Sequence, residues 1–181
     1  MEFLRRKGTE APASTLASKL RMTFQQFEQE IERVPEALRA KQPGPLAWSV
    51  HEILDHLVES DRPAVLELRQ LCAGVSPTSG PIPARLKSPD PLDRPWASLV
   101  DELKNLHTQI LEIVIKAGDQ TPTVARASVT MVIKVPGPNG PEVLEWIDAV
   151  DWKAYAQTLR IHAHEHRAQV ERTVAALTAG T

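Results

Sequence analysis

The sequence predicts an all-α protein of four long helices, with a long crossover between the second and the third and a small β-hairpin before the last. Four segments carry apolar residues at helical spacing, the first connection is short and the second long, and a β-branched run precedes the last segment. With 181 residues, 42% hydrophobic and 24% charged, the chain has the size and composition of one globular domain. We expect that domain to span residues 1–181, with residues 1–13 as a flexible N-terminal segment.

Composition and charge argue against several classes of protein. A net charge of −2 provides no positive field to attract nucleic acid or an anionic membrane. No apolar run approaches the roughly 20 residues of a membrane span, and the basic N-terminal residues are not followed by the apolar stretch of a secretory signal, so we expect a cytoplasmic protein. Cys72 is the only cysteine, which excludes an internal disulfide and a thiolate cluster. We interpret Cys72 as a buried or half-buried residue without a chemical role, and any metal must be held by histidine and carboxylate.

The first helix is predicted over about residues 14–34. Its apolar residues recur at spacings of three or four and share one helix face. They are Leu16, Leu20, Phe24, Phe27 and Ile31. Pro35 should end this helix, and residues 35–39 (PEALR) give a short helical turn before the proline- and glycine-rich residues 41–46. Because this connection is short, the second helix should run antiparallel to the first.

The second helix is predicted from Val50 to about Ala73. Ser49 and Glu52 have the S-x-x-E spacing of a capping box, in which the side chain of each residue bonds the backbone N–H of the other. An apolar periodic run follows and predicts one buried stripe along the helix. The residues expected in this stripe are Val50, Ile53, Leu57, Ala64, Leu68 and Leu71.

A long connection at residues 74–95 carries six prolines and two glycines, which exclude a regular helix. If the second and third helices are parallel, the chain must return along a helix of roughly 36 Å. A crossover explains the length of this connection better than the alternative, a disordered segment. The third helix is predicted over about residues 96–117, with Gly118 as its C-terminal stop. Its expected apolar face comprises Leu99, Leu103, Leu106, Ile110 and Ile113.

The hydrophobic period changes after the third helix. Residues 128–135 are β-branched, a turn-rich run (PGPNGP) follows, and residues 143–150 form a second extended run. We therefore expect a hairpin within residues 121–150. The alternative is that residues 143–150 begin the last helix, which is otherwise predicted over about residues 151–177.

Three of the six histidines lie within residues 161–169 (IHAHEHRAQ) on the last helix. On a helical wheel His162 and His166 are about 40° apart beside the apolar stripe, whereas His164 lies roughly opposite them. Two histidines at positions i and i+4 bring their rings within reach of one metal ion. The alternative is a half-buried pair that is hydrogen-bonded within the protein. An HExxH protease motif is excluded, because Ala168 stands where its second histidine is required.

The second helix carries two further histidines, His51 and His56. The wheel places them on opposite sides of the buried stripe, at roughly 130° and 90° from its centre. This geometry favours His56 as a partner of the histidine pair without deciding between the two. We interpret His107, on the third helix, as a flanking residue without a special role.

Two of these stretches resemble the motifs of a known family. Residues 48–57 (WSVHEILDHL) resemble the W-S-x-x-E-[IV]-x-x-H-L signature of the DinB/YfiT-like superfamily, and residues 162–169 (HAHEHRAQ) resemble its H-x-x-x-H-R-x-Q motif. The resemblance covers most of the chain and implies an all-α, DinB-like four-helix bundle of up-down-down-up topology, which the helix order, the short first connection and the long second connection fit. It also implies that His56, His162 and His166 hold a divalent ion, most often nickel or zinc, and leave coordination positions open.

The resemblance further implies a metal-dependent enzyme that transfers a low-molecular-weight thiol to a small electrophilic substrate, or that hydrolyses or isomerises such a substrate. The alternatives are a non-catalytic metal- or ligand-binding stress-related protein and a metal-free bundle with an interaction role. We expect a small-molecule substrate, a homodimer, and no nucleic-acid or membrane partner. The catalytic residues are not identified. Glu59 and Glu165 are candidates for a general base, with solvated helix charges as the alternative, and Tyr155 could donate a hydrogen bond but is expected to pack in the core.

Overall fold

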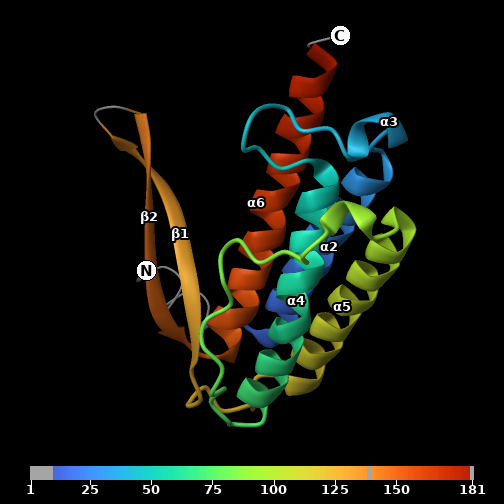
Figure 1. Cartoon of the computed structure of the whole chain (residues 1–181). Coiled ribbons are helices and arrows are strands. Elements are labelled where there is room, and N and C mark those ends of the chain that lie inside the picture. Colours follow the sequence, from blue (N-terminus) through green and yellow to red (C-terminus); the bar gives the residue numbers. More distant parts are fainter. Residues whose placement is uncertain (1–9, 138–139, 180–181) are drawn as a thin grey trace.

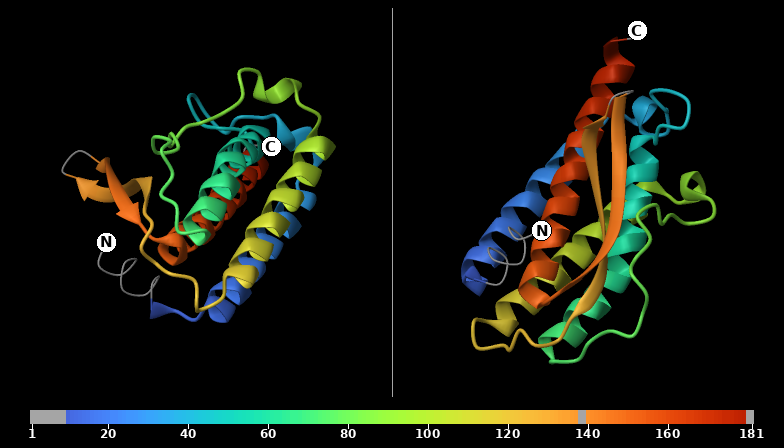
Figure 2. Two further views of the ribbon diagram at one scale, coloured as in Figure 1. Left: turned by 90° about the horizontal axis from the view of Figure 1, so that it is seen from below. Right: turned by 90° about the vertical axis from the view of Figure 1, so that its left-hand side faces the viewer.

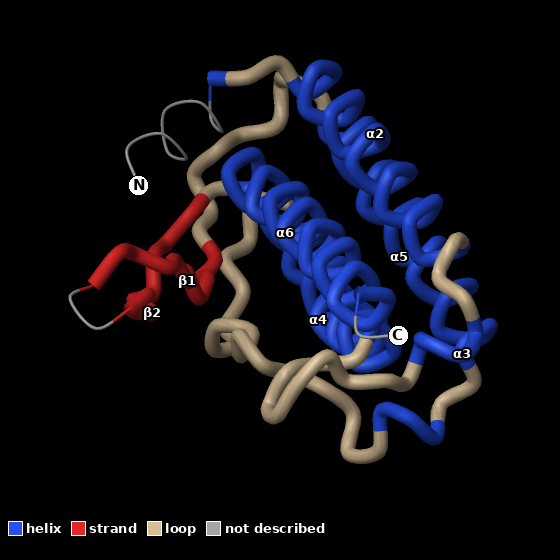
Figure 3. The backbone as a smooth tube through the Cα atoms, turned by 90° about the horizontal axis from the view of Figure 1, so that it is seen from above, coloured by secondary structure: helices blue, strands red, loops and turns tan. Residues whose placement is uncertain are grey.

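Four long helices form a bundle (Figure 1). The computed structural model describes residues 10–137 and 140–179. Its long helices are α2 (Ala13–Glu32), α4 (Val50–Cys72), α5 (Trp96–Ala117) and α6 (Trp152–Ala179). Helices α2 and α6 run in one direction and α4 and α5 in the other, which confirms the predicted up-down-down-up topology (Figure 2). Viewed along the bundle, α4 and α6 form one layer and α2 and α5 the other (Figure 3).

Helix α2 buries the apolar face predicted for it. The five predicted residues are each at most 2% exposed. The helix ends before Pro35, and the predicted helical turn is α3 (Glu36–Arg39). Of the segment 1–13 that was expected to be flexible, residues 1–9 lie outside the described residues, whereas Ala13 begins α2 and is 4% exposed.

The predicted capping box fixes the start of α4. The Ser49 hydroxyl accepts a hydrogen bond from the Glu52 N–H at 3.2 Å, and the Glu52 carboxylate accepts one from the Ser49 N–H at 2.9 Å. The six residues of the predicted stripe are each at most 1% exposed. Burial extends beyond this stripe, and all of residues 50–58 are buried. The cause is the crossover connection, which hydrogen-bonds to the outer face of α4.

Ser49→Ala should lower the free energy of unfolding by about 1 kcal/mol, because the Glu52 N–H loses its capping acceptor. Urea unfolding measures this change. Ser18→Ala is the matched control, since Ser18 is exposed on α2 and its hydroxyl bonds the Ser14 carbonyl within the helix. This control should change stability by less than about 0.5 kcal/mol. Equal losses in the two variants would contradict the role of the cap.

Residues 73–95 cross from the end of α4 to the start of α5, as the crossover interpretation expects (Figure 2). They contain one short 3-10 helix, η1 (Pro91–Asp93), and are otherwise irregular. Because α4 and α5 are parallel, this connection has to travel the length of α4, and it lies along that helix as it does so (Figure 1). It therefore covers the face of α4 that the helices leave open.

Helix α5 has the predicted bounds and nearly the predicted apolar face. Four of the five predicted residues are buried, but Ile113 is only half-buried and the neighbouring Val114 is buried in its place. Gly118 ends the helix with a φ of 63°. Glycine adopts this left-handed conformation without the strain that a Cβ atom would bring.

The β-branched segment forms the expected hairpin. Strand β1 (Ala127–Gly137) pairs antiparallel with β2 (Gly140–Val150), and the centre of the predicted turn lies outside the described residues. The alternative, in which residues 143–150 begin the last helix, is wrong, because α6 begins only after β2. At the base of the hairpin Ala127 and Val150 are paired and 2% exposed, whereas the distal part projects from the bundle (Figure 2).

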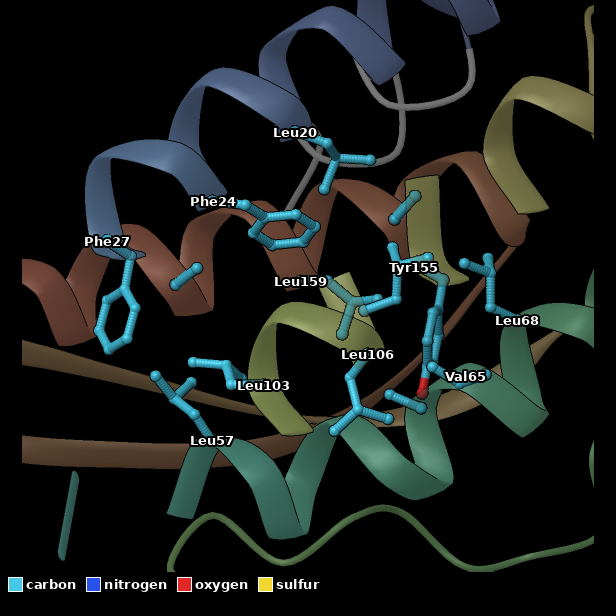
Figure 4. Close-up of a cluster of buried hydrophobic side chains, with 14 of the residues drawn as sticks. Leu20, Phe24, Phe27, Leu57, Val65, Leu68, Leu103, Leu106, Tyr155 and Leu159 are labelled. Carbon is cyan, nitrogen blue, oxygen red and sulfur yellow. The ribbon is translucent and has the colours of Figure 1, made fainter. Parts of the chain in front are cut away.

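A common apolar core holds the two helix layers together (Figure 4). All four long helices contribute to it, and the side chains labelled in Figure 4 are Leu20, Phe24, Phe27, Leu57, Val65, Leu68, Leu103, Leu106, Tyr155 and Leu159. Burial of apolar surface is the dominant favourable contribution to folding, so packing in this core fixes the position of α4 relative to α6. Within the described part of the chain, no helix combines the length and the apolar character needed to cross a membrane.

Candidate metal centre

Three histidines from α4 and α6 meet between these two helices. The Nε2 atom of His162 lies 3.0 Å from Nε2 of His56 and 3.1 Å from Nε2 of His166. One ring nitrogen from each residue lies within 4.8 Å of the other two. His56 is 1% exposed, and the two histidines of α6 are half-buried. The structure thus brings together the three residues that the sequence singled out.

The other two histidines of α4 and α6, His51 and His164, lie away from this cluster. His164 is exposed on α6, as its place on the helical wheel predicts. His51 is buried, but its Nε2–H donates to the Arg94 carbonyl at 2.9 Å and its ring meets Trp96 edge-on at the start of α5. His56 therefore faces α6 while His51 faces α5, which decides the choice that the wheel left open.

Hydrogen bonds at Nδ1 orient two of the three rings. The His56 Nδ1 atom lies 2.7 Å from the Leu86 carbonyl oxygen, and the His166 Nδ1 atom lies 2.9 Å from Oε1 of Gln169. A carbonyl oxygen can only accept a hydrogen bond, so each Nδ1 carries the proton and each Nε2 keeps a free lone pair. Partners of this kind fix the tautomer and the orientation of metal-binding histidines.

The three Nε2 atoms cannot satisfy one another by hydrogen bonding. His56 and His166 both present lone pairs to Nε2 of His162, which can carry one proton at most. One lone pair is therefore left facing another nitrogen at a distance of 3.0 or 3.1 Å, which is unfavourable in a buried site. A divalent ion accepts all three lone pairs, and imidazole is a preferred ligand of zinc and nickel. The residues present thus fit a metal ion.

Burial keeps the three rings neutral. It is the main cause that holds the pKa of His162 well below its ordinary value, and the neighbouring rings of His166 and His56 add to the effect. Burial also lowers the pKa of His166 to about 3. It lowers the pKa of His56 as well, although the Leu86 carbonyl acts in the opposite direction. Since neutral imidazole is the form that binds metals, the cluster is ready to bind at neutral pH.

Trp48 forms a wall of the cluster. Its ring centroid lies 5.1 Å from that of His56 and 6.4 Å from that of His166, and it is nearly parallel to the latter ring. The ammonium group of Lys87, on the crossover connection, lies 5.1 Å from the Trp48 centroid and 2.6 Å from Oε1 of Glu52. The tryptophan that opens the motif, two residues before α4, thus packs directly against two of the candidate ligands.

The family model of the DinB superfamily matches residues 19–181, which is most of the chain. The chain belongs to the DinB superfamily. No curated protein matched it. Membership of this family and the three convergent histidines together fit a metal-dependent DinB-like protein.

The other residues considered for catalysis in this DinB-superfamily protein are engaged elsewhere or exposed. Glu59 is ion-paired with two arginines at 2.5 and 2.8 Å. The Tyr155 hydroxyl lies in the core, where it donates to Oε2 of Glu67 at 2.6 Å. Glu165 is exposed on α6. The structure therefore supports structural or solvated roles for these residues, and none is assigned as a general base.

The environment of His107 differs from the interpretation made from the sequence. It is 1% exposed rather than a flanking residue, and its ring stacks on Phe24 with a centroid distance of 3.8 Å. Its Nδ1 atom lies 2.7 Å from Oε1 of Glu28 on α2, and its Nε2 atom lies 3.6 Å from Oδ2 of Asp61 on α4. The interpretation was wrong because these partners belong to two other helices, which the spacing along α5 does not reveal.

The residues that orient the ligands were also missed. Gln169 ends the last-helix motif one turn after His166, and its i,i+3 spacing from that histidine was a usable signal. Leu86 acts through its backbone carbonyl, which no side-chain pattern marks. Cys72 is half-buried as predicted, and burial raises the pKa of its thiol to about 11, which agrees with the absence of a chemical role for it.

Proposed function

We propose that this protein is a metal-dependent enzyme that binds nickel or zinc through His56, His162 and His166 and transfers a low-molecular-weight thiol to a small electrophilic substrate. The convergence of three Nε2 atoms supports the proposal more than any other observation. Three protein ligands leave coordination positions free, which is typical of catalytic metal sites. When bound, such an ion lowers the pKa of a thiol or water ligand and so supplies a nucleophile near neutral pH.

The protein's own residues give the site its shape. The Leu86 carbonyl and the Gln169 amide hold two of the rings through their Nδ1 atoms, so that the Nε2 lone pairs stay directed at one point. Trp48 packs against these rings and bounds the cluster on that side. Ligands held in this way lose little conformational freedom when they bind, which favours tight binding.

The surroundings favour a thiol over water as the nucleophile. Glu59 is held in ion pairs and the Tyr155 hydroxyl is bonded to Glu67, so neither is placed to take a proton from water. A free thiol has a pKa of about 8.5 and bulk water one of about 15.7, so a bound ion would have to lower the pKa of a thiol by far less to give the anion at neutral pH. A thiol therefore depends less on a general base than water does.

Thiol transfer can be tested with protein purified without a histidine tag and loaded with nickel or zinc. The loaded protein is incubated with bacillithiol, mycothiol or glutathione and an alkyl halide, and the thioether product is measured by mass spectrometry. We expect product to form faster than in protein-free controls, with the gain lost in His56→Ala and kept in His164→Ala.

A non-catalytic metal-binding protein is the second candidate, since the three-histidine cluster supports metal binding without requiring turnover. It predicts that the loaded protein gives no product above the protein-free rate with any of the three thiols. That result would contradict the proposed transferase while leaving metal binding in place.

A further inference from the structure

A buried carboxylate fastens the crossover connection to α4 next to the candidate metal centre. Asp55 is fully buried, with 0% exposure. Its Oδ2 atom accepts a hydrogen bond from the Ser88 N–H at 2.9 Å, and its Oδ1 atom accepts from the Ser88 hydroxyl and from the Arg94 guanidinium, both at 2.8 Å. All of the bonds that the structure gives this carboxylate thus go to the connection.

Residues 86–88 are held to α4 one after another. The Leu86 carbonyl accepts from His56 Nδ1–H at 2.7 Å, Lys87 pairs with Glu52 at 2.6 Å, and Ser88 bonds Asp55. Asp55 and His56 are consecutive on α4, so the two bonds at the ends of this tripeptide come from neighbouring side chains. The position of the Leu86 carbonyl is therefore tied to the Asp55–Ser88 contact two residues away.

The tripeptide has no regular secondary structure to keep it in place. It lies in an irregular segment, and fixing each residue of such a segment costs about 1–2 kcal/mol in conformational entropy. Bonds to a rigid helix have to offset that cost. Without them the Leu86 carbonyl would leave His56 Nδ1, and the His56 ring would lose the partner that selects its tautomer.

We propose that Asp55 is a positioning residue of the metal centre: by binding Ser88 it holds the Leu86 carbonyl against His56 Nδ1 and so keeps His56 Nε2 directed at the ion. The inference rests on the proposed function only in that His56 serves as a metal ligand. It assigns Asp55 and Ser88 no contact with the substrate. Their effect reaches the site through the backbone of the connection.

The test compares Asp55→Asn with Glu102→Gln in the full-length protein without a histidine tag. Glu102 is the matched control, because its carboxylate also pairs with Arg94, at 3.0 Å, but its other partner is Arg62 rather than residues 86–88. Competition with a chelator should show nickel or zinc binding weakened about 10–100-fold in Asp55→Asn and changed by less than about twofold in Glu102→Gln. Ser88→Ala, at a half-buried position of the connection, should weaken binding about 3–10-fold and serves if Asp55→Asn does not fold.

A second measurement needs no metal. Long-range 1H–15N NMR of the metal-free protein reports the tautomer of His56, which should be the single Nδ1–H form in the starting protein and in Glu102→Gln. In Asp55→Asn and Ser88→Ala a mixture of tautomers is expected. If the starting protein binds no metal, the proposed function fails, and the His56 tautomers still show whether Asp55 holds the Leu86 carbonyl against His56 Nδ1. If it binds metal and Asp55→Asn matches Glu102→Gln in both measurements, the inference alone is overturned.

Discussion

His162→Ala should weaken the binding of nickel or zinc by more than about 100-fold. The His162 Nε2 atom stands between those of His56 and His166, at 3.0 and 3.1 Å, so the substitution removes the central one of three donors. Losing a residue that only orients a ligand already costs about 10–100-fold in affinity, and losing the ligand itself should cost more. Competition with a chromophoric chelator, on protein without a histidine tag, measures the dissociation constant.

His164→Ala is the matched control for this substitution. It removes the same kind of side chain two residues away on α6, but from an exposed position, so the affinity should stay within about twofold. His56→Ala and His166→Ala should behave like His162→Ala. Equal losses in His162→Ala and His164→Ala would show that the cluster between α4 and α6 does not bind the ion.

The free energy of unfolding of Asp61→Asn, relative to that of the starting protein, should be larger at neutral pH than at about pH 4. Burial raises the pKa of Asp61 to about 6 from an ordinary value of 3.8, and His107 acts in the opposite direction. The folded protein therefore binds this proton more tightly than the unfolded chain, and the free energy of unfolding falls as the pH rises from about 4 to about 6. A difference of about two pKa units corresponds to about 3 kcal/mol, and asparagine, which does not ionise, avoids this loss.

Urea unfolding of the variant and of the starting protein, with a chelator present to remove metal, measures the contribution of Asp61. The contributions of the other titrating groups to the pH dependence of stability largely cancel between the two proteins. The difference in stability should grow by about 3 kcal/mol in favour of Asp61→Asn between about pH 4 and about pH 6, and stay constant above that. Asp101→Asn, at an exposed position of α5, should show no such growth. The opposite trend would mean that the folded protein favours the ionised form of Asp61.

Much of the fold could be predicted because each helix carries its own signals. Apolar spacing, the cap at Ser49 and the stop at Gly118 act locally, and the length of residues 74–95 was enough to indicate parallel neighbours. The prediction left a helix as the alternative to the hairpin for residues 143–150, because they are a short apolar run whose conformation depends on pairing with β1. The burial of the whole first half of α4 could not be predicted, since the connection that covers it has no regular pattern.

The candidate site could be predicted only where its geometry lies within one helix. The helical period alone pairs His162 with His166. The choice of His56 over His51 depended on the family resemblance, because both are buried, at 1% and 7% exposure, and the backbone carbonyls that tell them apart belong to the irregular crossover. The role of Leu86 and the carboxylates around His107 follow from tertiary contacts, which no local spacing encodes.

The metal content of untagged protein tests most directly the claim that His56, His162 and His166 hold a divalent ion. The protein is dialysed against nickel or zinc, the excess is removed, and the bound metal is measured by elemental analysis. About one ion per chain is predicted, since the three rings converge on one position and are neutral at neutral pH. Fewer than about 0.2 ions per chain with both metals would contradict the claim.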